Sequence, residues 1–551
     1  MKIFKKTTAL LIFIVLIAAI LRLTFLNSYP NGITVDEAGQ AVSAYSILKT
    51  GSDEWSDFLP LNPRGFGDYK PPVLMYLMVP SISLFGLNEF SVRLPSALAG
   101  ILTVLVTFFL VKQLFNKPGL ALLSAFLMAI APWHVYYSRL GWESNIGLLF
   151  FVCGFWLFLK SLQSGKYLIL SALSFGFAGL SYHSFKLLVP LMVISLVLIF
   201  WKQVKKVNKT LLVTSVSVCL IFILVLGYGF VFSGASRRAS DQSIAKEENL
   251  SILRKIQTED GLPQPLNRLV HNKYFFIASE VTDNYLGYFS FPFVFGPHRS
   301  DSSVLNFPTL GLLYIWQLPL LLIGLWYLLK NRDRSSVVLL SWILLAPIPA
   351  SLTQDYMHAG RAQALFPALT IVSSLGFYLV IDYTKRLKYR SFLLLLAFIV
   401  VTASLFMRIN HYMYHTFNNP LGGLKQGYKQ VVEFTESVKD DYDRIIFTKA
   451  HSEPHAFVAF YAKTDPSVIQ KESAGWKKFE QEGLKFLDMT DYNMGKYEFK
   501  NINIHAERVR PNTIIVASPE EVPPLFVPKF EVKDASGKPI FLIFDTNELP
   551  E

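Results

Sequence analysis

Long apolar runs separated by short polar stretches dominate the chain up to about residue 410. A helix needs about 20 mostly apolar residues to cross a bilayer, with roughly 17–25 as the working range. Runs near this length recur eleven times, and we expect a transmembrane helix at each of them. The runs are Thr8–Leu26, Leu94–Leu110, Leu120–Tyr137, Asn145–Leu159, Tyr167–Ser181, Leu187–Trp201, Leu211–Phe232, Leu310–Leu329, Val337–Ala350, Leu365–Ile381 and Phe392–Met407.

Basic residues between these runs predict which side each loop occupies. They form short clusters after every second run, as the positive-inside rule expects of cytoplasmic loops. The clusters are Lys112 and Lys117; Lys160 and Lys166; Lys202, Lys205, Lys206 and Lys209; Lys330, Arg332 and Arg334; and Lys385, Arg386, Lys388 and Arg390. All of them become cytoplasmic if the N-terminus lies inside, and the C-terminus then lies outside the cytoplasm.

One further apolar stretch, Pro71–Gly86, is predicted not to cross the membrane. A crossing there would move every later basic cluster to the wrong side. The stretch is short and opens with two prolines, so we expect an interfacial or re-entrant helix at the outer surface. The sequence therefore predicts an all-α polytopic membrane protein of about eleven spans plus this interfacial helix.

Three long segments lie outside in this topology, at residues 27–93, 233–309 and 408–551. The last segment is less apolar and richer in charge, and it holds strand-like runs with turn residues between them. These runs are Arg444–Thr448, Thr513–Ala517 and Ile540–Phe544. We expect a transmembrane domain over residues 1–409 and a small extracytoplasmic α/β domain over residues 410–551.

Composition agrees with a membrane protein and narrows the alternatives. Hydrophobic residues make up 52% of the 551 positions, and the mean hydropathy is +0.37. The net charge of +12 is spread over the loop clusters and forms no single patch, so no nucleic-acid partner is expected. Cys153 and Cys219 lie inside apolar runs, which argues against a disulfide scaffold or a thiolate metal site. The stretch 21–27 lacks a small-residue cleavage pattern, so the first run is predicted to remain as a span.

The first external segment carries an acidic pair, Asp36 and Glu37, at the start of a helical pattern. Thr34 and Glu37 have the spacing of a capping box, and acidic residues in a first turn complement the helix dipole. That structural explanation accounts for the pair by itself. A functional explanation makes Asp36 a general base held at the membrane surface, and the two are compatible because a capped helix start is rigid.

Basic residues at the outer ends of spans are a second group of candidates. Lys70, directly before Pro71 and Pro72, is expected at headgroup depth, where it either contacts anionic lipid or binds a phosphate. Arg139 ends a span on the outer side, where the positive-inside rule does not favour arginine, and either binds a ligand or pairs with Glu143.

A short outer loop holds His358 and Arg361, which are either membrane anchors or phosphate contacts. Other outer-loop candidates are His183, Lys186, Arg237, Arg238, Asp283 and His298. The chain shows no metalloprotease histidine pair, no phosphate-cradling glycine loop and no nucleophile elbow.

Taken together, four motifs resemble a known family. They are the acidic pair at 36–37, Lys70-Pro71-Pro72, the run Glu89–Gly100 and the outward span that ends in Arg139. This series resembles the bacterial lipid A aminoarabinose transferases and the related protein O-mannosyltransferases, which are membrane glycosyltransferases of the GT-C fold. The resemblance covers roughly residues 8–410 and is most specific between Thr34 and Glu143.

The resemblance implies a role for each matched residue. Asp36 would bind or deprotonate the acceptor hydroxyl, with Glu37 in support. Lys70 would contact the phosphate of a lipid carrier, Arg139 would face the active cavity, and Arg361 would add a second phosphate contact next to His358.

The chain also departs from both groups at the same motif. Aminoarabinose transferases tend to have an acidic residue directly before the lysine, whereas this chain has Tyr69 there and Asp68 one place earlier. The mannosyltransferases tend to have histidine in place of Lys70, and their inserted luminal domain is not found here. These departures leave open the sugar and the presence of a divalent metal, for which the sequence offers no clear ligand set.

We therefore expect a multi-pass protein of the cytoplasmic membrane that moves a sugar from a polyprenyl-phosphate donor to a lipid, glycan or protein acceptor. The alternative is a transporter or flippase for a lipid-linked substrate. A transporter is expected to carry charges near the bilayer midplane, whereas the charges here gather at the outer ends of the spans.

Overall fold

The computed structural model describes residues 2–65, 69–232, 242–260, 263, 266–267, 270–296, 311–414, 425–451, 453–481, 486–534 and 536–549. The chain forms two compact units. The helical unit contains Met1–Thr24, Ser96–Ser300 and Leu305–Arg408, and the mixed unit contains Phe25–Pro95, Asp301–Val304 and Ile409–Glu551. The first external segment therefore belongs to the same unit as the C-terminal segment. The sequence predicted a separate domain for the C-terminal segment alone.

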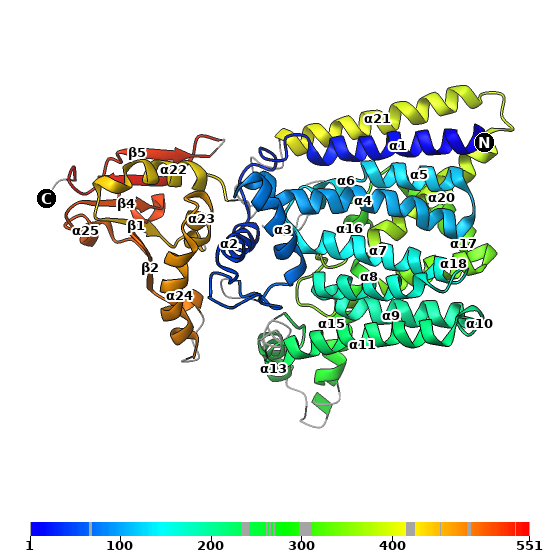
Figure 1. Ribbon diagram of the computed structural model, residues 1–551, viewed down its shortest axis with the longest axis horizontal. Helices are drawn as coiled ribbons and strands as arrows, with labels where there is room; N and C mark the ends of the chain where they lie inside the picture. The colour runs from blue at the N-terminus through cyan, green and yellow to red at the C-terminus, as the bar shows by residue number, and fades with distance from the viewer. Residues whose placement is uncertain are drawn as a thin grey trace. The chain divides into compact units, whose positions relative to one another are not determined.

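The helical unit is built from long helices that lie side by side (Figure 1). Its principal helices are α1 (Lys2–Leu23), α4 (Glu89–Phe115), α5 (Pro118–Ile130), α6 (Pro132–Ser138), α7 (Glu143–Ser161), α8 (Tyr167–Ser181), α9 (His183–Ile199), α11 (Lys209–Phe232), α17 (Gln317–Asn331), α18 (Arg334–Leu345), α20 (Leu365–Thr384) and α21 (Arg390–Tyr414). Between them lie α10 (Trp201–Val204), α13 (Glu247–Glu259), α15 (Lys273–Gly287), α16 (Phe291–Val294) and α19 (Ile348–Ser351).

A helix lies at each of the eleven predicted spans. Among the described residues, seven helices are long and apolar enough to cross a membrane, or eight if the bent pair α5–α6 counts as one span. The other three are α8, α9 and α17, with 15, 17 and 15 residues. The total of eleven spans therefore stays a prediction, because a helix of that length falls short of about 20 residues.

The predicted span Leu120–Tyr137 is not one straight helix. It bends by 58° between α5 and α6, where Pro132 supplies no backbone N–H and ends the ladder of α5. Arg22 of α1 is fully buried beside this break and donates a 2.9 Å hydrogen bond to the carbonyl of Ala129. Sequence reasoning missed this role of Arg22.

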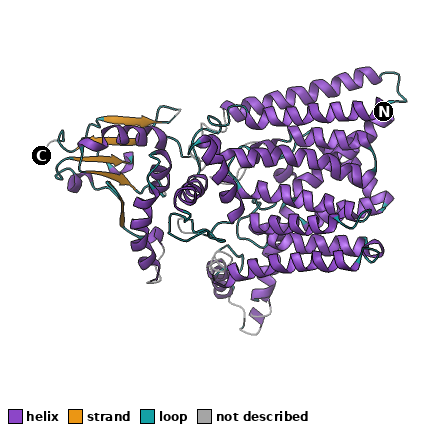
Figure 2. Cartoon of the chain, viewed as in Figure 1, coloured by secondary structure: helices purple, strands orange, loops and turns teal. Residues whose placement is uncertain are grey.

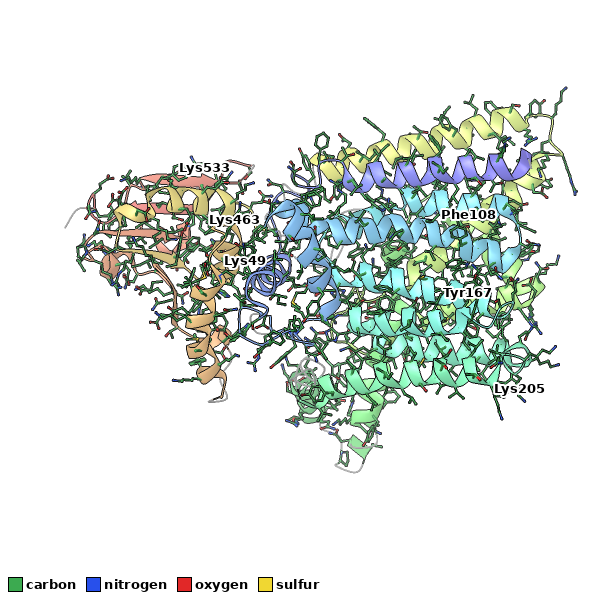
Figure 3. All side chains as sticks on the ribbon, in the orientation of Figure 1. Lys49, Phe108, Tyr167, Lys205, Lys463 and Lys533 are labelled. Carbon is green, nitrogen blue, oxygen red and sulfur yellow. The ribbon has the colours of Figure 1, made fainter. Side chains whose placement is uncertain are left out.

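The predicted cytoplasmic loops lie at one end of the helical unit. Ser335 Oγ donates to the carbonyl of Leu114 at 2.7 Å. This bond joins the start of α18 to the end of α4. Lys160 lies 4.2 Å from the ring centre of Tyr167, and Figure 3 shows Tyr167 at the same end of the helices as Lys205. The alternation of basic clusters along the chain is thus matched by their arrangement in space.

The mixed unit combines helices with a six-stranded sheet, and every strand among the described residues lies in this unit (Figure 2). Its strands are β1 (Arg444–Thr448), β2 (Asp491–Met494), β3 (Tyr497–Lys500), β4 (Thr513–Ala517), β5 (Phe530–Lys533) and β6 (Pro539–Asp545). Its helices are α2 (Val35–Thr50), α3 (Pro72–Phe85), α22 (Tyr428–Val438), α23 (Pro454–Tyr461), α24 (Pro466–Gln481) and α25 (Ile504–Glu507).

The sheet has the order β2-β3-β1-β4-β6-β5. Its central strand β1 pairs in parallel with β3 and β4, and the outer pairings are antiparallel. Tyr428 of α22 stacks on Phe457 of α23 at 4.2 Å and faces Phe447 of β1, so these helices cover one face. The three strands expected from the sequence are confirmed, because central strands buried on both faces show as continuous apolar runs. The short strands β2, β3 and β5 were not predicted.

Candidate active site

Helix α2 begins with a capping box. Thr34 Oγ1 accepts from the backbone N–H of Glu37, and Glu37 Oε2 accepts from the backbone N–H of Thr34, both at 3.0 Å. Both bonds satisfy N–H groups that a helix start leaves without an intrahelical partner. The structural explanation for the acidic pair is therefore correct, and it also gives Asp36 a fixed platform.

Asp36 pairs with Lys70 across the first external segment. The distance from Lys70 Nζ to Asp36 Oδ1 is 2.6 Å, and the two side chains are 13% and 31% exposed, respectively. Lys70 is itself held by its backbone N–H, which donates to the carbonyl of Pro63 at 2.9 Å. The structure thus joins the predicted base and the predicted phosphate ligand, which are 34 positions apart in the sequence.

Glu37 faces inward and serves the framework. Its Oε1 accepts from Nε of Arg93 at 3.0 Å, and both side chains are fully buried. Arg93 also donates to the carbonyls of Leu26, Pro30 and Gly32. Both carboxylate oxygens of Glu37 are therefore engaged. This suits a residue that holds Asp36 in position and does not suit a residue that contacts substrate. Arg93 lay in a motif used for the resemblance, but sequence reasoning gave it no role.

A tight turn before α20 holds His358 and Arg361 together in the helical unit. His358 Nδ1 accepts from the backbone N–H of Arg361 at 3.2 Å, and Arg361 Nη2 pairs with Asp355 Oδ2 at 2.6 Å. Burial, followed by the charge of Arg361, lowers the pKa of His358 to about 3. The imidazole is therefore neutral near pH 7, and with Nδ1 as acceptor its hydrogen lies on Nε2.

Arg139 is buried at the end of α6, and its Nη1 donates to the carbonyl of Leu21 at 3.0 Å. His358, Arg361 and Arg139 belong to the helical unit, whereas Asp36 and Lys70 belong to the mixed unit. Of the other candidates, His183 opens α9, Lys186 lies one turn further along it, and Asp283 lies on α15. Arg237, Arg238, His298 and Asp68 lie outside the described residues.

The described residues around Asp36 do not form a divalent-metal site. Within the described part of the chain, no group of three or more His, Cys, Asp and Glu side chains is placed to hold one ion. The charged partner of Asp36 is the ammonium of Lys70, and the neighbouring carboxylate of Glu37 pairs with Arg93. The steps proposed below therefore use no metal.

The other end of α2 joins the first external segment to the C-terminal sheet region. Trp55 is fully buried, and its ring lies 5.6 Å from Trp476 and 5.7 Å from Phe486, edge to face. Gln470 Nε2 donates to the carbonyl of Asp53 at 2.9 Å, and Lys477 Nζ pairs with Asp57 at 2.9 Å. These contacts explain why the first external segment and residues 409–551 form one unit.

Asp53 and Glu54, next to Trp55, are fully buried carboxyl groups. Burial raises the pKa of Asp53 to about 6 and the pKa of Glu54 well above its ordinary value. Asp53 Oδ1 accepts from the backbone N–H groups of Trp55 and Asp57, and Glu54 Oε2 accepts from Ser43 Oγ at 2.5 Å. Sequence reasoning missed this pair, because nothing in its local pattern separates it from a solvated acidic turn.

A sequence model of the family described as dolichyl-phosphate-mannose-protein mannosyltransferase matches residues 69–228. Two proteins of Bacillus subtilis (strain 168), YkcB and YycA, whose names suggest mannosyltransferase activity, are also similar. YkcB is 33% identical over 132 residues, which are 24% of this chain and 18% of that protein. YycA is 27% identical over 251 residues, which are 45% of this chain and 35% of that protein. The chain thus matches much less than half the length of either relative.

Two solved structures share the fold at low sequence identity. ArnT from Cupriavidus metallidurans in the apo state superposes with a TM-score of 0.54 and 13% identity, covering 99% of both chains. The oligosaccharyltransferase AglB from Archaeoglobus fulgidus, in complex with an inhibitory peptide and a dolichol-phosphate, gives 0.51 and 17%, covering 83% of this chain and 64% of that one. The resemblance stated from the motifs is confirmed: the chain resembles protein mannosyltransferases over residues 69–228 and shares the GT-C fold with ArnT.

Proposed function

We propose that the chain is an integral membrane glycosyltransferase of the cytoplasmic membrane. It moves a sugar from a polyprenyl-phosphate donor to an acceptor hydroxyl on the outer side. The observation that carries this proposal is the pair of Asp36 and Lys70, whose side chains meet at 2.6 Å while Asp36 stays one-third exposed. The pair joins a group that can take a proton to a group that can stabilise a phosphate.

The placement of Asp36 suits a general base. Its helix start is held by the capping box, and the buried pair of Glu37 and Arg93 fixes that turn from behind. A base on a rigid element keeps its geometry towards the acceptor, and small displacements are costly for catalysis. Asp36 is the acidic residue of this turn that solvent reaches, since Glu37 is fully buried.

The proposed reaction is one displacement at the anomeric carbon. The acceptor oxygen forms a bond to that carbon and gives its proton to Asp36, while the bond from the carbon to the lipid phosphate breaks. The phosphate leaves with the bonding electron pair, and the ammonium of Lys70 stabilises its added charge. For Arg361, Arg139 and His358, which belong to the helical unit, phosphate binding stays the role that the resemblance implies. Direct displacement inverts the configuration of the anomeric carbon.

The comparisons support the choice of donor. The matched family is described by a dolichyl-phosphate-mannose donor and a protein acceptor, and the AglB structure holds a dolichol-phosphate and a peptide. A transporter or flippase is the second candidate. Against it, the charged candidates lie at helix starts, helix ends and turns, whereas transporters keep charged groups near the midplane.

Sugar transfer by membranes that contain the chain tests the proposal. Wild type, Asp36→Asn and Asp57→Asn are expressed to equal level and given labelled polyprenyl-phosphate sugars with an envelope extract as acceptor. We expect transfer by wild type and a loss of about 10²–10⁴-fold in Asp36→Asn. Asp57 is an aspartate of the same external segment that pairs with Lys477, so Asp57→Asn is expected to keep its activity.

The outcomes separate the candidates. Equal transfer by wild type and Asp36→Asn would reduce Asp36 to a helix-start residue and move the search to other carboxylates. A chain that transfers no sugar but moves the lipid-linked substrate across the membrane is a transporter.

We expect Lys70→Met to lower the rate by about 10²–10³-fold, because the leaving phosphate loses its cation.

A further inference from the structure

The turn before α20 holds an unusual buried amide. The side chain of Gln363 is 1% exposed, and neither its Nε2 nor its Oε1 has a hydrogen-bond partner among the described residues. Buried amides are normally paired, because an amide without partners keeps the full cost of its desolvation. An amide with both its donor and its acceptor unmatched points to a ligand that supplies both.

The backbone around Gln363 is fixed, so the amide is not a loosely placed side chain. The N–H groups of Arg361 and Ala362 donate to the carbonyl of His358, and the N–H of Phe366 donates to the carbonyl of Gln363. Trp342 Nε1 donates to the carbonyl of Ala364 at 2.8 Å and ties the turn to α18. A rigid turn therefore presents the amide.

Further buried polar atoms without partners gather at the same turn. Arg361 Nη1 and Trp142 Nε1 have no hydrogen-bond partner within the described ranges. Trp142 Nε1 lies 3.8 Å from the position that a Cβ on Gly360 would take, so the indole N–H lies against this turn. Arg361 and Trp142 each leave one N–H donor, and Gln363 leaves its whole amide, without a partner among the described residues. The other terminal nitrogen of Arg361, Nη2, pairs with Asp355.

The chemistry of these groups identifies the ligand class. A sugar hydroxyl is both a donor and an acceptor, which matches one amide, and a guanidinium suits a phosphate. We propose that Gln363 binds a hydroxyl group of the donor sugar and, with Trp142, sets the preference for a glycosylated lipid phosphate over the bare lipid phosphate. This inference rests on the proposed function, because it takes a lipid-phosphate sugar as the ligand of this turn in the helical unit.

A binding measurement on purified protein tests this without relying on turnover. The probes are a polyprenyl phosphate and the same lipid carrying mannose, titrated into wild type and Gln363→Met. We expect wild type to prefer the glycosylated lipid, and the variant to bind it about 10- to 100-fold more weakly. The affinity of the variant for bare polyprenyl phosphate should equal that of wild type, because Arg361 is unchanged.

Thermal unfolding separates a ligand contact from a structural one. Gln317 is a matched control, since it is also buried in the helical unit but its Oε1 accepts from the backbone N–H of Tyr314 at 3.0 Å. Gln317→Met should lower the unfolding midpoint, because it leaves that N–H without a partner. Gln363→Met should leave the midpoint unchanged or raise it, because it removes an amide that lacks partners.

Each outcome has a defined meaning. If wild type prefers the glycosylated lipid and Gln363→Met keeps that preference, the inference is wrong while the proposed function stands. A fall in the unfolding midpoint as large as that of Gln317→Met would also overturn it, because Gln363 would then have a structural partner. If wild type binds neither lipid, or binds both equally, the proposed donor itself fails.

Discussion

Asp36 and Glu54 lie in the same external segment but meet opposite surroundings. Asp36 is one-third exposed and pairs with the ammonium of Lys70. Glu54 is fully buried, and Ser43 donates a hydrogen bond to one of its oxygens. A carboxyl group keeps its charge beside a cation and loses it in an apolar environment. One segment therefore holds a partly exposed aspartate beside a cation and a buried glutamate whose pKa lies well above its ordinary value.

The buried carboxyl groups predict a pH dependence of stability. Burial raises the pKa of Asp53 from 3.8 to about 6 and that of Glu54 well above 4.5. Between its pKa in the unfolded chain and its pKa in the folded chain, each carboxyl group is ionised when the chain is unfolded and protonated when it is folded. Its contribution to stability is therefore complete below about pH 4. It declines as the pH rises through about 6 for Asp53 and to higher pH for Glu54.

Glu54→Gln keeps a neutral group of the same shape at all pH values. We expect the unfolding midpoint of this variant to fall less between pH 5 and pH 8 than that of wild type. Glu433→Gln, at an exposed position of α22, is the control and should follow wild type. If Glu54→Gln and wild type lose equal stability, then Glu54 is ionised in the folded chain.

At the scale of single elements, the start of α2 depends on a residue from another helix. Arg93 of α4 donates to Glu37 and to three carbonyls of the segment that leads into α2. A buried pair of this kind gives modest net stability but is costly to break, because the remaining charge has no solvent. The position of Asp36 is therefore set jointly by the capping box and by a guanidinium 57 positions away in sequence.

Arg93→Met should lower the free energy of unfolding by about 3–5 kcal/mol, since it leaves the charge of Glu37 buried and unpaired. Arg444→Met is the control, because that arginine pairs with Glu498 at a half-exposed surface and should cost about 1 kcal/mol or less. Chemical denaturation of these two variants, of Glu37→Gln and of the double variant Glu37→Gln/Arg93→Met measures the pair. If the double variant loses as much as the sum of the single ones, Glu37 and Arg93 are not coupled.

At the scale of the whole molecule, the arrangement of charge predicts the orientation in the membrane. The helical unit places its basic loops at one end (Figure 3), and such loops remain on the cytoplasmic side during insertion. An N-terminus inside and an odd number of spans then put the C-terminal sheet outside. This orientation is also the one that gives the proposed site access to an outer acceptor.

Cysteine labelling measures this orientation directly. Starting from a chain in which Cys153 and Cys219 are replaced by alanine, we expect Lys463→Cys to react with an impermeant thiol reagent on intact cells. Lys205→Cys should react after the membrane is opened. If Lys205→Cys alone reacts on intact cells, the topology is the inverse of the predicted one. If both variants react on intact cells, an even number of spans separates the two positions.

The sequence by itself determined the features that depend on local composition and spacing. Apolar runs placed a helix at every expected span, because each lipid-length run must satisfy its own backbone hydrogen bonds. The capping box followed from Thr34 and Glu37, since its bonds join neighbours in the chain. The strands β1, β4 and β6 followed from apolar runs, whereas β2, β3 and β5 are four residues long and carry little pattern.

Tertiary structure alone decided which distant residues meet. The pairs of Asp36 with Lys70 and of Glu37 with Arg93 need the chain to fold back on itself, and no local spacing encodes that. Tertiary packing likewise joins Trp55 to the aromatic side chains of the C-terminal segment and buries Asp53 and Glu54. It also leaves the amide of Gln363 without a partner among the described residues. Burial and partner choice are properties of the packed molecule, because the desolvation of a polar group depends on everything that surrounds it.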